Sequence, residues 1–108
     1  MPVIKVTSDE HFTELLNSPN HDYIFVDFYA DWCVPCKRIA PKLEQFSTQF
    51  KTVLFAKVNV DENSGLANRF KVMSIPTLII FKGGKEVERI IGSQTAESIE
   101  EKLKKYFK

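Results

Sequence analysis

The chain has 108 residues, of which 44% are hydrophobic and 27% charged, a balance typical of a globular protein with one hydrophobic core. Its 15 basic and 14 acidic residues leave a formal net charge of +1, which argues against a nucleic-acid partner and against an anionic membrane surface. No apolar stretch is long enough to cross a bilayer, and the N-terminal sequence MPVIKVTSDEHF lacks the apolar core of a signal peptide. We therefore expect a single domain over residues 1–108 that works in the cytoplasm; we also expect it to be a monomer.

Apolar periodicity along the chain predicts alternating strands and helices in the order βαβαβαββα. The strands are expected at residues 3–6, 23–30, 53–61, 77–82 and 86–92, and the helices at 7–18, 33–50, 63–70 and 95–107. This order predicts an α/β fold: a central mixed sheet with parallel strands, helices on both faces, and an antiparallel edge contributed by the final hairpin.

Three local signals refine these elements. Thr7 and Glu10 have the spacing of a capping box at the start of the first helix. Pro41 falls inside the long second helix and should kink it. Gly83 and Gly84 separate the last two strands and are typical of a two-residue hairpin turn.

The segment DWCVPCK, residues 31–37, contains the only two cysteines of the chain, Cys33 and Cys36. A disulfide between them would close a very short loop and remove little entropy from the unfolded chain, so a structural clip explains the pair poorly. Cys33 follows a strand and opens a helix, where unpaired N–H groups and the helix dipole favour a thiolate. We predict an exposed nucleophile of low pKa at Cys33 and a more buried resolving thiol at Cys36. Pro35 suits the first helical turn because the N–H that it lacks would have no partner there.

Asp27 and Lys57 each place a charge in the middle of a predicted strand of mostly apolar residues. A buried carboxylate is costly unless it is neutralised or paired. The two side chains could point to solvent or form a structural pair. Alternatively, burial raises the pKa of Asp27, which then acts as a general base for Cys36 while Lys57 tunes it. We favour the last interpretation because Asp27 lies just upstream of the two cysteines.

Pro76, in the segment MSIPTLII, precedes a buried strand and is a candidate for a cis peptide bond. The combination of WCxPC after a strand, an aspartate six residues before the first cysteine, SIPT, and a glycine after VERII resembles the thioredoxin family over essentially the whole chain. The resemblance implies the thioredoxin fold, with Cys33 as the attacking cysteine and Cys36 as the resolving one. It also implies that Asp27 is the buried acid, Lys57 its partner, and Pro76 the cis-proline beside the dithiol.

The resemblance further implies a substrate groove around the cysteines. Ile75 would pair through its backbone with an extended substrate segment, and Trp32 and Gly92 would line the groove. Val34 and Pro35, between the cysteines, and Pro76 complete the expected substrate-binding set.

The activity implied by the resemblance is the reduction of disulfides in client proteins, which contributes to cell redox homeostasis. The family is recharged by a thioredoxin reductase with electrons from NADPH, holds no cofactor of its own, and binds no metal. Two residues depart from the family pattern. Val34 replaces the usual glycine and stiffens the turn, so we hypothesise that it alters the choice of reductase or client, or the reduction potential. Tyr29 stands where many members have a second tryptophan, and should change packing and fluorescence rather than chemistry.

Three alternatives stay open. An oxidase or isomerase, as in domains of protein disulfide isomerase, is disfavoured by the proline before the second cysteine and by the lack of a signal peptide. A non-catalytic module could use the groove to bind a partner, although the chain keeps both cysteines and Asp27. A zinc site needs four ligands, and His11 and His21 have no ligand spacing to the cysteines, so only a bridged dimer would hold metal.

Overall fold

The computed structural model describes residues 3–107, so residues 1–2 and 108 of the expected domain lie outside the described part. The elements follow the predicted order. The strands are β1 (Val3–Lys5), β2 (Tyr23–Tyr29), β3 (Val53–Asn59), β4 (Thr77–Lys82) and β5 (Lys85–Ile91), and the helices are α1 (Asp9–Leu16), α2 (Val34–Gln49), α3 (Ser64–Arg69) and α4 (Ala96–Tyr106). None of the helices within residues 3–107 is long and apolar enough to span a lipid bilayer.

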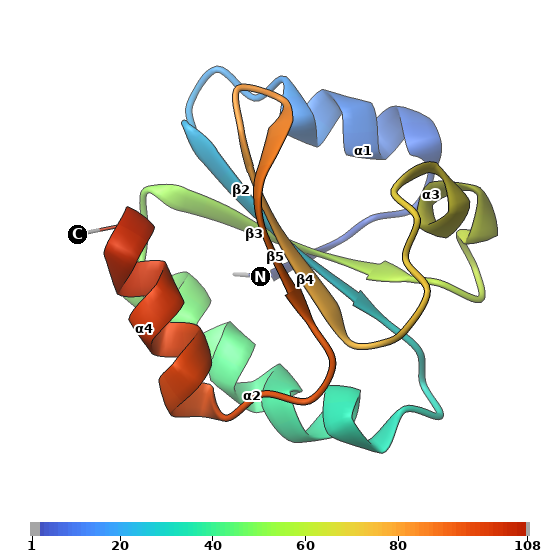
Figure 1. Cartoon of the computed structure of the whole chain (residues 1–108). Helices are drawn as coiled ribbons and strands as arrows, with labels where there is room; N and C mark the ends of the chain where they lie inside the picture. The colour runs from blue at the N-terminus through green and yellow to red at the C-terminus, as the bar shows by residue number, and fades with distance from the viewer. Residues whose placement is uncertain (1–2, 108) are drawn as a thin grey trace.

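The five strands form one mixed sheet in the order β1-β3-β2-β4-β5. β1, β3 and β2 run parallel, whereas β4 is antiparallel to both β2 and β5. Helices α1 and α3 cover one face of this sheet, and α2 and α4 cover the other (Figure 1). The predicted α/β fold is confirmed, with β5 as the antiparallel edge and β2 in the centre.

The alternation of side chains along β2 divides the core into two layers. Ile24, Val26 and Phe28 pack on the face covered by α1 and α3, whereas Phe25 packs on the face covered by α2 and α4. Residues two apart in a strand share a face, so Asp27 points to the same side as Phe25, toward α2. The second face is filled from the helices by Ile39, Leu43, Phe46, Ile99 and Leu103. The sheet therefore directs the buried carboxylate toward the helix that carries the cysteines.

The predicted capping box at Thr7 and Glu10 is wrong. Ser8 caps α1, because its Oγ accepts the backbone N–H of His11 at 3.0 Å. The backbone N–H of Thr7 instead donates to Nδ1 of His11, also at 3.0 Å. Two adjacent hydroxyl residues could each have filled the cap, and the side chain of His11 favours the arrangement with Ser8.

The predicted hairpin is confirmed, since Gly83 and Gly84 join β4 to β5 with φ values of 59° and 80°. Both values lie in the left-handed region that glycine adopts without steric cost. α2 continues as a helix through Pro41, and the kink expected there stays a prediction.

Candidate active site

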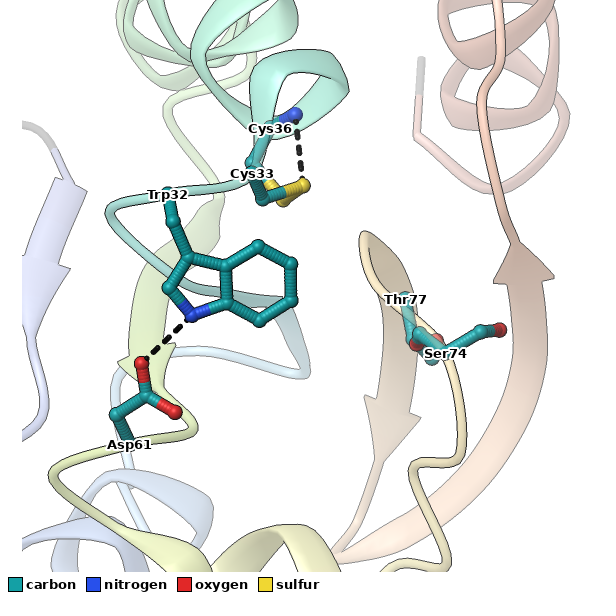
Figure 2. The surroundings of a disulfide bond; sticks show 6 residues. All are labelled: Trp32, Cys33, Cys36, Asp61, Ser74 and Thr77. Atoms are coloured by element: carbon teal, nitrogen blue, oxygen red, sulfur yellow. Dashed lines mark hydrogen bonds between the residues drawn. A yellow bond between two sulfur atoms is a disulfide. The ribbon is translucent and has the colours of Figure 1, made fainter.

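Cys33 and Cys36 form a disulfide at the start of α2, and their Cα atoms lie 5.2 Å apart (Figure 2). Cys33 is the N-cap residue of the helix, with the extended backbone that this position requires. Its sulfur accepts the backbone N–H of Cys36 at 3.2 Å. A free N–H group at a helix N-terminus stabilises negative charge, so the geometry favours a thiolate at Cys33 once the disulfide opens.

The prediction that Cys33 is exposed is wrong for this disulfide form. Cys33 is 4% exposed and Cys36 is 3% exposed, so the two differ little in burial. Both pack with Ala30, against the half-buried side chains of Tyr29, Val60 and Ile75. Sequence spacing alone does not reveal this packing of Cys33 against its neighbours.

Asp27 and Lys57 lie side by side, as predicted, because they are register partners in the parallel pair of β2 and β3. Asp27 is only 5% exposed, which rules out the alternative that it points to solvent. Its Oδ1 atom has no hydrogen-bond partner among the described residues. A cavity of about 240 Å³ joins the two to Cys36; its lining consists of Asp27, Tyr29, Ala30, Asp31, Cys36, Lys37, Ala40 and Lys57.

Burial raises the pKa of Asp27 from its ordinary value of 3.8 to about 7, and the positive charge of Lys57 opposes this rise. The two charged groups form no direct ion pair, so Lys57 acts on Asp27 through its charge at a longer distance within the cavity that both line. A carboxyl group with this pKa can accept or release a proton near neutral pH. Lys57 also lies 5.9 Å from the centre of the Tyr29 ring, so Tyr29 borders the same cavity.

Trp32 forms the exposed wall on one side of the disulfide. Its side chain is 68% exposed, and its Nε1 donates to Oδ2 of Asp61 at 2.9 Å, which fixes the indole beside the cysteines (Figure 2). A hollow of about 320 Å³ adjoins this wall, lined by Trp32, Val60, Val72, Met73, Ser74 and Ile75. Trp32 and Ile75 therefore line one hollow, whereas Gly92, which was expected to line the groove with Trp32, is not among its lining residues.

Met73 lines this groove and Asp61 holds its Trp32 wall in place, and neither residue was predicted from the sequence. Asp61 follows the end of β3, at the same edge of the parallel strands as the cysteines, and this position is the signal that would have marked it. Met73 is 93% exposed, although a methionine is usually buried. The sequence could have indicated a place for Met73 in the groove only through its position three residues before Pro76.

The bond between Ile75 and Pro76 is cis, as the sequence suggested. The carbonyl of Pro76 accepts the backbone N–H of Gly92 at 2.9 Å, which brings the turn after β5 next to the loop before β4. Gly92 has a φ of +84°, so this position requires glycine for its backbone conformation. Val34 is 60% exposed and projects from the turn between the cysteines.

Three residues considered in the sequence analysis remain: Pro35 of the cysteine motif, and His11 and His21, which were weighed as metal ligands. Pro35 is half-buried in the first turn of α2. His11 and His21 hydrogen bond within their own segments, to Thr7 and Ser18. Within residues 3–107, no group of three or more His, Cys, Asp or Glu side chains is arranged to hold a metal ion.

Comparison with known proteins identifies the family. The Thioredoxin family model matches residues 3–105. The thioredoxin of Staphylococcus haemolyticus is 44% identical over 107 residues, covering 98% of this chain and 99% of that protein, and the thioredoxin of Chlamydia caviae is 40% identical over 97 residues, covering 90% and 92%. A solved thioredoxin structure from Nicotiana alata has a TM-score of 0.90 at 37% identity, covering 99% of this chain and 94% of that one. The chain therefore belongs to the thioredoxin family and, with its redox pair Cys33 and Cys36, is a thiol–disulfide oxidoreductase.

Proposed function

We propose that the protein is a general reductant of protein disulfides in which Cys33 attacks the client and Cys36 releases it. The observation that carries the proposal is the hydrogen bond from the Cys36 N–H to the Cys33 sulfur at the start of α2. The Cys33 thiolate attacks one sulfur of the client disulfide, and the other client sulfur leaves as a thiolate. Cys36 then attacks the Cys33 sulfur of the mixed disulfide and expels the second client thiolate. Two electrons pass to the client, and Cys33 and Cys36 become the disulfide.

Asp27 is the proposed general base for the second step. Cys36 must lose its proton before it can attack, and Asp27 lines the same cavity with an Oδ1 atom that has no hydrogen-bond partner within residues 3–107. Because burial raises the pKa of Asp27 to about 7, its carboxylate is basic enough to accept that proton near neutral pH. Lys57, the register partner of Asp27 at the same cavity, limits this rise of the pKa and so tunes the base.

The groove on the exposed side of the disulfide is the proposed client site. Trp32 and Ile75 supply its apolar wall, and an extended client segment pairs with the backbone of Ile75 next to Pro76. Gly92, held against Pro76, keeps this approach open because it has no side chain. Val34 and Pro35 form the turn that the client crosses on its way to the sulfur of Cys33.

The proposed electron supply is external. Thioredoxins in general work without a bound cofactor, and family membership supports recharging by a thioredoxin reductase that takes electrons from NADPH. The protein acts on its clients as a monomer in the cytoplasm.

The assignment of the two cysteines is tested with two variants, Cys36→Ser and Cys33→Ser. Each is reduced, freed of reductant, and mixed with insulin as the client. Cys36→Ser should accumulate a covalent adduct with insulin, visible by non-reducing electrophoresis, because nothing resolves the mixed disulfide. Cys33→Ser should form little adduct. The opposite pattern, or equal trapping by both variants, would overturn the assignment.

A further inference from the structure

Two cationic side chains, Arg38 and Lys42, follow the disulfide along α2. Val34, Arg38 and Lys42 are spaced four residues apart and so lie on one side of the helix. Val34 is exposed next to the cysteines, and Arg38 and Lys42 are also exposed. This side of α2 therefore carries positive charge at Arg38 and Lys42, beyond its first turn.

Arg38 and Lys42 border a depression of about 310 Å³. The loop between β5 and α4 forms its other wall, running beside α2 (Figure 1). The lining consists of Arg38, Ile39, Lys42, Ser93, Gln94, Thr95 and Ala96, and includes no carboxylate. The loop begins directly after Gly92, whose N–H is bonded to Pro76. One wall of this depression, which we call the cationic depression, thus begins beside Pro76 on the client side of the active site.

Neither cation of the depression is neutralised within the described residues. The four ion pairs of residues 3–107 involve other side chains. The pKa of Glu100 is lowered first by the hydrogen bond from Gln49, at 3.3 Å, then by Lys104, at 3.4 Å, and least by the charge of Lys42, so this carboxylate is already engaged by other groups. Arg38 and Lys42 are consequently available for an anionic group that arrives from outside.

We propose that the cationic depression binds acidic side chains of client proteins, so that the preferred clients carry Asp or Glu near the disulfide to be reduced. This inference rests on the proposed reductase function and names its substrate class. Charge complementarity speeds encounter and fixes orientation more than it adds affinity, and its effect on rate suits a brief reaction complex.

The geometry of α2 sets the spacing of the acidic residues. With a rise of 1.5 Å per residue, Arg38 and Lys42 lie about 6 and 12 Å along the helix from Val34. An extended client segment advances about 3.3 Å per residue. Its acidic residues should therefore stand about two to four residues from the cysteine that Cys33 attacks.

Two carboxylates lie on the Trp32 side of the disulfide, although Lys37 and Lys57 border the same cavity as Asp31. Asp61 holds Trp32 there, and Asp31 is exposed next to it. An acidic segment placed over Trp32 would meet these carboxylates, so it is directed over α2. The charge distribution therefore also fixes the orientation in which the client lies across the site.

The test uses three synthetic peptide dimers, each joined by one disulfide. The first carries glutamates on both sides of its cysteine at the spacing derived above, the second has glutamines in their place, and the third has the glutamates moved beyond the reach of the depression. Their rates of reduction are compared for the full chain, for Arg38→Gln/Lys42→Gln and for Arg38→Glu/Lys42→Glu. A matched control, Lys51→Gln/Lys85→Gln, removes two exposed charges from the opposite end of the molecule.

The glutamate dimer should be reduced about two- to tenfold faster than the glutamine dimer at about 20 mM salt, and the ratio should shrink at about 300 mM. The ratio should fall to about one in Arg38→Gln/Lys42→Gln, drop below one after charge reversal, and persist in the lysine control. The third dimer, with its glutamates out of reach, should be reduced no faster than the glutamine dimer. If the ratio of the glutamate-dimer rate to the glutamine-dimer rate is the same in all variants, the inference about the cationic depression is wrong. The proposed function would still stand in that case, because reduction of the glutamine dimer tests it separately. No reduction of the glutamine dimer by the full chain would overturn both.

Discussion

Replacing Asp27 with asparagine should make the free energy of unfolding less dependent on pH. The carboxyl group of Asp27 keeps its proton up to about pH 7 in the folded protein, compared with an ordinary pKa of 3.8. At about 1.4 kcal/mol for each pH unit, this interval corresponds to about 4 kcal/mol of destabilisation when the group is fully ionised. Asparagine has nearly the same shape and carries no charge, so it removes this cost.

The sign follows from proton binding. Between pH 4 and 7 the folded state holds a proton on Asp27 that the unfolded state has lost, so stability falls as pH rises through this interval. The contribution of Asp27 is least unfavourable below its unfolded pKa and most unfavourable above about pH 7. From pH 5 to 9 the parent should lose roughly 3 kcal/mol relative to Asp27→Asn. The buried amide of asparagine adds a cost of about 1–3 kcal/mol that does not change with pH. The test is therefore the slope of the free energy of unfolding against pH, and not the constant difference between the two proteins.

The assay is urea unfolding of the disulfide form of both proteins at several pH values from 5 to 9. Asp22→Asn is the matched control, because the same change is made at an exposed carboxyl group just before the same strand. The free energy of unfolding of Asp22→Asn should change with pH in the same way as that of the parent. A constant difference between Asp27→Asn and the parent across the range would refute the reasoning, because it would mean that Asp27 ionises in the folded protein as it does in the unfolded chain.

Three further predictions concern packing, the hairpin and the turn between the cysteines. Leu103→Ala removes a fully buried side chain of α4 and should lower the free energy of unfolding by about 2–5 kcal/mol in a urea titration; a loss under about 1 kcal/mol would contradict the packing of α4 against the sheet. Gly84→Ala forces an L-residue to a φ of 80° and should cost about 1 kcal/mol, so an unchanged unfolding midpoint would speak against the turn. Val34→Gly should change the reduction potential or the rate with a reductase, and identical values for both proteins would remove any special role for Val34.

The parts of the fold that could be predicted depend on local patterns. The continuous apolar run of β2 and the pair Gly83 and Gly84 each identify their element from neighbouring residues alone. The adjacency of Asp27 and Lys57 was also accessible, because successive parallel strands of an α/β unit tend to pair. The sequence could not predict that Asp27 and Lys57 are register partners on the same face of the sheet, because this depends on how the two strands align.

The parts that could not be predicted depend on contacts between distant segments or on chemical state. The hydrogen bond between Trp32 and Asp61 joins two loops 29 residues apart, and no periodicity marks it. The burial of Cys33 reflects packing of the disulfide form, whereas the sequence indicates only where a thiolate would be stabilised. The cap of α1 at Ser8 was missed because Thr7 offers the same chemistry one residue earlier.

The reduction potential of the Cys33–Cys36 pair tests the central claim most directly. The protein is equilibrated with graded thiol–disulfide buffers, and its free thiols are counted at each ratio. We predict a potential at or below the glutathione poise of the cytosol, so that the reduced protein gives electrons to its clients. A potential near about −180 mV or higher, as in isomerases and oxidants, would contradict a role as a reductant.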